Sequence, residues 1–140
     1  MLEAAEVLGD EKLLAKVKPV ATHIAQVANE EGLDPDGSLR YEDRDTDKVW
    51  WAQAEAIVGF FNAYQLTGNT HFLDASLNCW QFVQDVLVDR QYGEWLGGVT
   101  AKGKLMPGEK VGSWKTTYHN GRCCLEMMRR VDQFVSMPDH

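Results

Sequence analysis

The chain has 140 residues, a hydrophobic share of 44%, a charged share of 25% and a formal net charge of −7. These shares are those of a globular protein, so disorder is excluded as the bulk state of the chain. The acidic balance argues against a nucleic-acid partner, because proteins that bind phosphate backbones cluster lysine and arginine. No apolar run approaches the ~18 residues that a membrane-spanning helix needs. We therefore expect a single domain at most, with neither a nucleic acid nor a membrane as partner.

The three cysteines, Cys79, Cys123 and Cys124, make a poor disulfide framework, because their number is odd and two of them are adjacent. A reducing compartment suits such a set, and we predict a cytoplasmic location. His119 and Cys123 have a spacing that could share a metal, but the sequence offers no second pair of ligands. A glycine-rich phosphate loop and a Cys-x-x-Cys motif are also missing, so we predict no metal and no cofactor.

The first residues, Leu2 to Leu8, have the pattern of the last turns of a helix that has no capping residue before it. Gly9 supplies a stop, and we expect the chain to be the C-terminal part of a longer protein. Asp10 caps a second predicted helix, from about Glu11 to Asn29, which Pro19 should kink. The predicted inward stripe of that helix consists of Leu13, Leu14, Val17, Ala21, Ile24 and Ala28.

A loop from Leu33 to Asp47, with a short extended piece at residues 38–41, leads to a helix of another kind. Residues 48–66 are apolar on every side, which is typical of a buried helix, and Gly68 ends it. The next predicted helix, His71 to Val88, is amphipathic. Its predicted inward face consists of Leu73, Leu77, Trp80, Val83 and Leu87. A glycine-rich stretch from Gly93 to Gly112 indicates a short β-hairpin, and a last helix covers about Tyr118 to Val135.

An internal repeat relates the two halves of this pattern. Gly9-Asp10 aligns with Gly68-Asn69, and Gly37-Ser38-Leu39 aligns with Gly93-Glu94-Trp95 after a short gap. Each unit is a buried helix, a glycine turn, an amphipathic helix and a long loop with a β element. Stacked units of this kind predict an all-α toroid or solenoid with the buried helices in its inner layer. Both long loops precede buried helices, so we expect them to gather at one end, where a site would form.

Three residues at the start of the buried helix are candidates for that site. Trp51 and Glu55 are four residues apart and share a face of the helix, beside Trp50. A carboxylate on an otherwise apolar helix must be paired or functional. For either tryptophan alone, a place in the core and a place in the site remain equal alternatives.

The start of the last helix carries the other candidates. The positive end of a helix disfavours imidazolium at His119, and a neutral ring is what a general base requires. The alternative is a histidine that merely caps the helix. Arg122 could pair with a buried carboxylate such as Glu55 or lie at the surface. The remaining histidines, which lie on polar faces, in a first turn or at the terminus, are His23, His71 and His140. Tryptophans, a carboxylate and a positioned histidine together indicate a sugar site, because aromatic faces stack on sugar rings.

Four ordered motifs carry a family resemblance. They are Trp-Trp-Ala-Gln-Ala-Glu-Ala at residues 50–56, Asn-Ala-Tyr-Gln-Leu-Thr-Gly at 62–68, Tyr-Gly-Glu-Trp at 92–95 and Trp-Lys-x-x-Tyr-His-Asn-Gly-Arg at 114–122. With these motifs the chain resembles the N-acylglucosamine 2-epimerase family, and its cellobiose 2-epimerase branch in particular. The resemblance runs from Leu2 to about Val131 but covers only the C-terminal third of a family member. It implies that residues 1–140 form an incomplete segment of an (α/α)6 barrel.

The resemblance also implies a chemistry, the epimerisation of a reducing-end sugar at C2 through an enediolate, with one histidine acting on each face. His119 matches one catalytic histidine, and Trp51 and Trp114 match aromatic residues that hold the sugar. We group Trp50, Glu55 and Arg122 with them as candidate sugar-binding residues. The second histidine belongs to a Gly-His-x-x-Glu motif upstream of the part matched here, and this sequence lacks it.

Two hypotheses about function follow. The first is that the chain is part of a sugar 2-epimerase and is inactive alone, its partner being the missing N-terminal half of the barrel or a second copy held through exposed inner helices. The second is that it is a non-catalytic carbohydrate-binding or interaction module derived from that fold.

Overall fold

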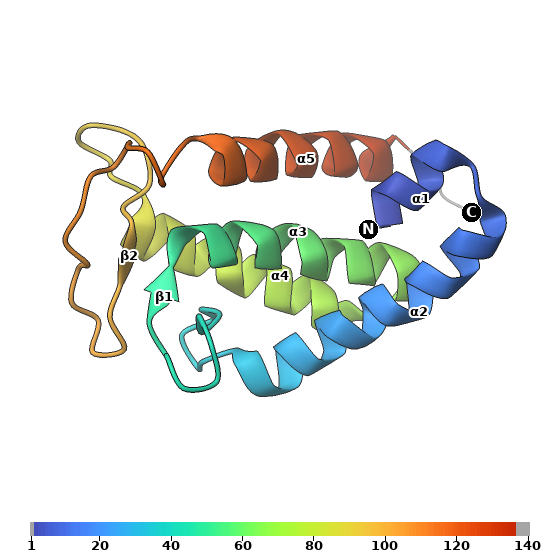
Figure 1. The fold of residues 1–140 in the computed structure, drawn as a ribbon, viewed down its shortest axis with the longest axis horizontal. Helices are drawn as coiled ribbons and strands as arrows, with labels where there is room; N and C mark the ends of the chain where they lie inside the picture. Colours follow the sequence, from blue (N-terminus) through green and yellow to red (C-terminus); the bar gives the residue numbers. More distant parts are fainter. Residues whose placement is uncertain (1, 137–140) are drawn as a thin grey trace.

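A computed structural model describes residues 2–136, so the predicted terminal position of His140 lies outside the described residues. The elements, in chain order, are α1 (Leu2–Leu8), α2 (Glu11–Val27), the π-helical turn η1 (Ala28–Gly32), β1 (Lys48–Val49), α3 (Trp50–Thr67), α4 (Thr70–Phe82), the π-helical turn η2 (Val83–Leu87), β2 (Gly98–Val99) and α5 (Tyr118–Val135). Figure 1 shows α3 in the middle of the molecule, with α5 on one side and α4 and α2 on the other. The predicted all-α class with short β elements in the loops is confirmed.

The ends of the helices follow local chemistry. The Asp10 carboxylate accepts a hydrogen bond from the Leu13 N–H (3.0 Å) and caps α2. Gly68 ends α3 in the left-handed conformation (φ 71°), which glycine adopts without a steric penalty. The Asn69 side chain accepts from the His71 N–H (3.1 Å) and so starts α4 at once. Two helices are therefore joined by a turn of two residues.

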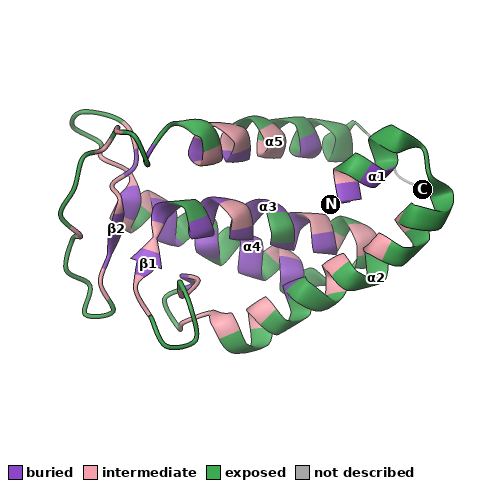
Figure 2. Ribbon diagram, viewed as in Figure 1, coloured by how far each residue is buried: buried purple, intermediate pink, exposed green. Residues whose placement is uncertain are grey.

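The core surrounds α3, as the all-round apolar pattern of that helix predicts. Figure 2 shows buried residues along most of α3, from Trp50 to Ala63. Phe60 and Ile57 of α3 pack with Cys79 of α4 and with Cys123 of α5 in one cluster. At the C-terminal end of α3 the buried guanidinium of Arg130 reaches Gln65 (2.6 Å) and also Glu3 of α1 (2.8 Å). This arginine ties α1, α3 and α5 together.

The sequence repeat is a structural repeat. Each outer helix, α2 and α4, ends in a five-residue π-helical turn, η1 or η2. A turn closed by an isolated bridge follows each time, Leu33 to Leu39 in the first unit and Val88 to Trp95 in the second. The glycines that the alignment pairs, Gly37 and Gly93, both have positive φ (83° and 76°). Both units thus end with the same π-helical turn and the same bridged turn. As a result, α3 and α5, which follow these turns, occupy equivalent inner positions.

The glycine-rich loop differs in part from the predicted hairpin. Val99 does bridge Leu105 across a local reversal, but the regular strand pairing of β2 is with β1, with Lys48 opposite Val99. The loop before α3 and the loop before α5 therefore meet at one end of the helices, at the left of Figure 1.

The buried faces of the outer helices differ in part from the predicted ones. On α4 the buried residues are Phe72, Ala75, Ser76, Cys79 and Phe82, so the face is rotated by about one residue. In the η2 turn that follows, Val83 and Leu87 are fully buried, as predicted. Leu77 and Trp80 lie exposed in a groove of about 570 Å³ between α4 and α5, here called the α4–α5 groove. On α2 only Ala25 is buried, and Leu13 and Ile24 are exposed. Periodicity identified the apolar stripes of α2 and α4, but many side chains of these stripes are exposed to solvent in this chain.

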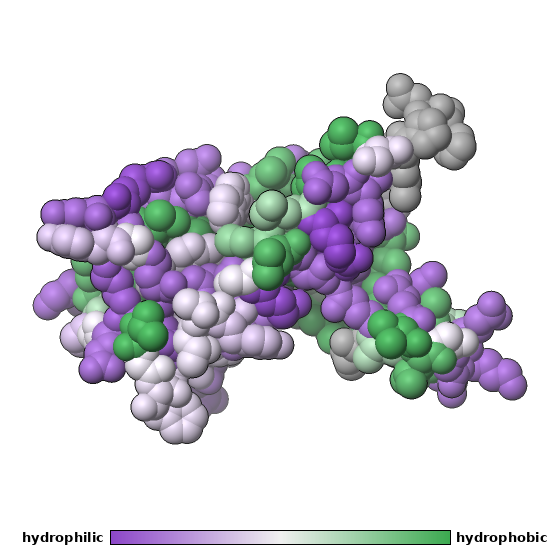
Figure 3. Space-filling view, turned by 90° about the horizontal axis from the view of Figure 1, so that it is seen from above, coloured by the Kyte–Doolittle hydropathy of each residue, from purple (hydrophilic) through white to green (hydrophobic). Residues whose placement is uncertain are grey.

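Figure 3 looks onto the α5 side of the molecule, where hydrophobic side chains lie exposed between charged ones. The exposed apolar residues of α5 include Leu125, Met128 and Phe134. Among residues 2–136, no helix is both long enough and apolar enough to cross a membrane.

Candidate active site

The candidate residues come together where α3 and α5 begin. Trp50, Trp51 and Glu55 occupy the first two turns of α3, and His119 and Arg122 occupy the first two turns of α5. The two helices lie side by side and begin at the same end of the molecule (Figure 1). Residues more than 60 positions apart in sequence therefore face one another across a single helix pair.

Glu55 is the centre of this cluster. One carboxylate oxygen lies 2.8 Å from Nδ1 of His119, and the other accepts a hydrogen bond from Nη2 of Arg122. Partial burial acts to raise the pKa of Glu55, but the hydrogen bonds and charges of Arg122 and His119 outweigh it, and the pKa lies below its ordinary value. Glu55 in turn raises the pKa of Arg122. Glu55 is thus an anion at neutral pH, paired rather than buried alone.

The ionised carboxylate decides how His119 is oriented. A carboxylate without a proton can only accept hydrogen bonds, so Nδ1 of His119 carries the hydrogen that lies between them. In a neutral ring the other nitrogen, Nε2, then holds the free lone pair. Glu55 therefore fixes both the direction of the ring and the nitrogen that is available as a base.

Aromatic rings surround the imidazole. The Trp50 ring meets it edge-on at 5.4 Å between centroids, and the Tyr118 ring does so at 5.0 Å. Trp51 lies at 5.9 Å with its plane tilted by 39°. Trp50 is only 6% exposed and belongs to the core cluster, whereas Trp51 is 39% exposed. Of the two adjacent tryptophans, Trp51 is therefore the one with surface available to a ligand.

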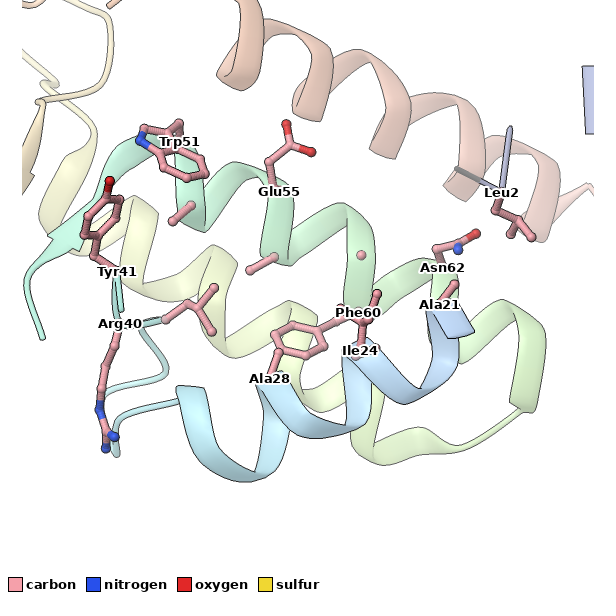
Figure 4. A pocket seen from close by; sticks show the side chains of 15 residues that line it. Leu2, Ala21, Ile24, Ala28, Arg40, Tyr41, Trp51, Glu55, Phe60 and Asn62 are labelled. Carbon is pink, nitrogen blue, oxygen red and sulfur yellow. The ribbon is translucent and has the colours of Figure 1, made fainter. Parts of the chain in front are cut away.

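An open groove of about 410 Å³ runs from Trp51 along α3, between α3 and α2; we call it the α2–α3 groove. Figure 4 shows Tyr41, Trp51 and Glu55 toward one end of it and Leu2 and Asn62 toward the other. Its walls are mainly apolar. The Tyr41 ring is perpendicular to the Trp51 ring, with 5.8 Å between their centroids, and it extends the aromatic end of the groove.

One candidate stands apart from the cluster. Trp114 is 98% exposed, in the loop just before α5, and no ring contact holds it against His119 or Trp51 in the part of the chain described. Sequence reasoning missed Tyr41 and Tyr118. Tyr118 stands inside the 114–122 motif, and Tyr41 ends the extended piece predicted at 38–41, so both had a signal in the sequence.

Within residues 2–136, no group of three or more histidine, cysteine, aspartate or glutamate side chains is arranged to hold a metal ion. The thiols of Cys79 and Cys123 are buried, and burial raises the pKa of each to about 12.

Paired inner and outer helices, with the site at the end where their loops meet, place the chain in the (α/α)6-barrel class. The chain belongs to the N-acylglucosamine 2-epimerase family: the profile of that family, described as N-acylglucosamine 2-epimerase (GlcNAc 2-epimerase), matches residues 2–123. The predicted family is thereby confirmed.

Known relatives agree with this assignment. The chain is 42% identical over 133 residues to a cellobiose 2-epimerase of Bacteroides fragilis, covering 90% of this chain and 34% of that protein. It is 30% identical over 111 residues to human N-acylglucosamine 2-epimerase, covering 69% of this chain and 26% of that protein. The crystal structure of a sugar epimerase from a ruminal bacterium superposes with a TM-score of 0.86 at 37% identity, over 93% of this chain and 35% of the other. The chain thus spans between about a quarter and about a third of the length of these relatives.

Proposed function

We propose that this chain supplies one side of the active site of a sugar 2-epimerase, with the rest of the barrel coming from polypeptide outside these 140 residues. The observation that carries the proposal is the His119–Glu55–Arg122 cluster, set among aromatic rings at the end of an open groove. The substrate class is a reducing-end sugar, and cellobiose is the first candidate because relatives with 42% and 38% identity to this chain are cellobiose 2-epimerases.

The arrangement suits proton transfer at C2 of a ring-opened sugar. Nε2 of His119 takes the C2 proton from one face, the electron pair left on carbon delocalises into the C1 carbonyl, and an enediolate forms. A proton returned to the opposite face of C2 gives the epimer, and proton return to the same face regenerates the substrate. Glu55 holds the imidazole in place and stabilises its protonated form, as the carboxylate partner of a catalytic histidine does. Trp51 offers an exposed ring for stacking on the sugar.

The opposite face of C2 needs a second group. Among the described residues the other histidines, His23 and His71, are exposed on the outer helices α2 and α4. The α2–α3 groove opens beside Glu55 and Trp51, and we infer that a helix of the absent part of the barrel fills it and carries the second histidine. The chain alone should therefore bind sugar weakly and should not epimerise it. Its three free cysteines support a reducing, cytoplasmic location.

The test compares the chain alone with a chimera. In the chimera, this chain replaces the 133 matched residues of the Bacteroides fragilis cellobiose 2-epimerase. Proton NMR of cellobiose should show a mannose-type epimer with the chimera and none with the chain alone. A folded chimera that binds cellobiose without epimerising it would instead support a non-catalytic carbohydrate-binding module. If the chain alone epimerises cellobiose at an enzymatic rate, the proposal that it supplies only one side of the active site is wrong.

A further inference from the structure

Glu94, in the loop between η2 and α5, has an unusual backbone. It is the one non-glycine residue with positive φ (68°) in the described part of the chain. A side chain beyond Cα is crowded in that conformation, which few residues other than glycine, asparagine and aspartate adopt. Strained positions of this kind persist where the surroundings compel them, and they cluster at functional sites.

The carboxylate is held by two buried partners from the start of α5 and the residues before it. Oε1 of Glu94 accepts hydrogen bonds from Nδ2 of Asn120 (2.6 Å) and from Nζ of Lys115 (3.2 Å). Lys115 is 8% exposed and Asn120 is 7% exposed. Lys115 also donates to the carbonyl of Lys110 (2.8 Å), which closes the loop on itself.

This network reaches His119 by two routes. Asn120 is the next residue in the first turn of α5, so its bond to Glu94 fixes the backbone that carries His119. The Lys115 ammonium lies over the Trp50 ring at 4.5 Å from its centroid, and that ring meets the imidazole edge-on. A cation over an aromatic face is an attractive contact, and it is stronger where water is excluded.

The same pair fixes the backbone that follows the exposed Trp114. Trp114 directly precedes Lys115, whose own carbonyl accepts a hydrogen bond from the Gly112 N–H (2.9 Å). With the Lys115 side chain buried and bonded, the position of residue 114 is limited to a short stretch of surface beside the start of α5.

We propose that Glu94 and Lys115 form a positioning pair, which sets the His119 ring against Trp50 and fixes the backbone next to Trp114. Ion pairs removed from water contribute little net stability because desolvation offsets their attraction, so the gain we assign to this pair is one of geometry. The naming of His119 and Trp114 as functional residues rests on the proposed function, but the positioning itself does not.

The test therefore uses NMR of the chain without sugar. The imidazole C–H signals of His119 lie in the ring-current field of Trp50 and Trp51, so their shifts report the placement of the ring. Glu94→Gln and Lys115→Met each remove one charge of the pair with little change in size. Both variants should lose most of the displacement of the His119 signals from those of the exposed His23. The Gly112 amide, which donates to the Lys115 carbonyl, should exchange faster with solvent.

The control is the neighbouring ion pair of the same loop. Lys110 contacts Asp89, donates to the Gly93 carbonyl (3.3 Å) and lies over the Tyr92 ring. Among the described residues, the cation over Trp50 is that of Lys115. Asp89→Asn and Lys110→Met make the same charge changes and should leave the His119 signals in place. The indole signals of Trp80 and Trp95, which pack together at 6.4 Å, verify that each variant keeps its core.

Two further variants keep the proposal falsifiable. Lys115→Arg retains both the charge and the contact with Trp50, and should restore the His119 signals if Lys115→Met disturbs them. Glu94→Gly relieves the backbone strain but removes the carboxylate, and should disturb them as Glu94→Gln does. Unchanged His119 signals in folded Glu94→Gln and Lys115→Met would overturn the proposal. Because no sugar or turnover enters this measurement, its failure is distinct from failure of the proposed function.

Discussion

Glu55 shows at the scale of one residue how the site is linked to stability. Its pKa is lowered in the folded chain, because the partners on α5 outweigh the effect of burial. A carboxyl group that binds protons less tightly when folded makes stability rise with pH, since the unfolded chain then holds more protons. The contribution of Glu55 is therefore complete above its ordinary value of 4.5 and is lost as the pH falls through the lower, folded-state value.

We predict that Glu55→Gln flattens the acid limb of the stability profile. The free energy of unfolding, measured with urea at a series of pH values, should fall less steeply below pH 4.5 in the variant than in the parent chain. Glu42→Gln, which removes a carboxylate from an exposed loop, is the matched control and should keep the parental slope. Equal slopes for the parent and Glu55→Gln would show that Arg122 and His119 do not hold this carboxylate in solution.

The sequence predicted which residues form the site better than it predicted which of them contact one another. Glu55 on an apolar helix and His119 at a helix start both carry a local signal. The pairing of Glu55 with Arg122 stayed one of two alternatives, because it depends on how α3 and α5 are placed, which no local pattern contains. Local pattern also does not contain which of the two tryptophans is buried. The structure buries Trp50, exposes Trp51 and brings Tyr41 into contact with Trp51.

At the scale of elements, the two repeats offer an internal comparison. Gly37 and Gly93 occupy aligned positions with positive φ. A Cβ on Gly37 would lie 2.8 Å from the Asn78 carbonyl oxygen of α4, whereas a Cβ on Gly93 would meet nothing within 4 Å. The Gly37 carbonyl also accepts a hydrogen bond from the Cys79 thiol (3.1 Å). The first turn is thus packed on the core and the second is open.

We predict that Gly37→Ala destabilises the chain more than Gly93→Ala does. Both variants place a side chain at positive φ, which costs roughly 1–2 kcal/mol. Only Gly37→Ala adds a collision with α4 backbone that cannot move without shifting the helix. Chemical denaturation of both variants gives the comparison, and equal losses would mean that the turn moves away from α4 freely.

Periodicity and turn chemistry located the helices because their causes are local. Asp10 and Gly68 supply a cap and a stop, and the internal repeat gives the elements of one unit counterparts in the other. The pairing of β1 with β2 joins segments about fifty residues apart, and the rotation of α4 by about one residue depends on which neighbours cover it. Those features depend on packing between distant segments, which sequence pattern alone does not specify.

At the scale of the whole molecule, the chain carries two open apolar grooves and an exposed apolar side on α5. Uncovered surfaces of this kind are common at sites of association. The α4–α5 groove is the more apolar in character, with Leu77, Trp80, Met128 and Val131 among its lining residues.

We predict that the isolated chain self-associates at micromolar concentration and that Leu77→Lys weakens the association. Leu77 is 54% exposed and lines the α4–α5 groove; Leu105 is 53% exposed in the loop after β2 and lines neither groove, so Leu105→Lys is the control. Sedimentation velocity should show the parent and Leu105→Lys as oligomers and Leu77→Lys shifted toward monomer. A parent chain that sediments as a monomer would contradict the prediction.

The central claim is that His119, held by Glu55, transfers the C2 proton. The most direct measurement is the turnover of cellobiose in heavy water by the chimera, followed by proton NMR at C2. We expect the chimera to form the epimer with deuterium at C2, and His119→Ala to lower the rate by roughly 10²–10⁴-fold while cellobiose still binds. His71→Ala, on the outer helix α4, should leave the rate unchanged. A His119→Ala chimera with turnover near that of its parent would contradict the claim and leave His119 as a residue that only begins a helix.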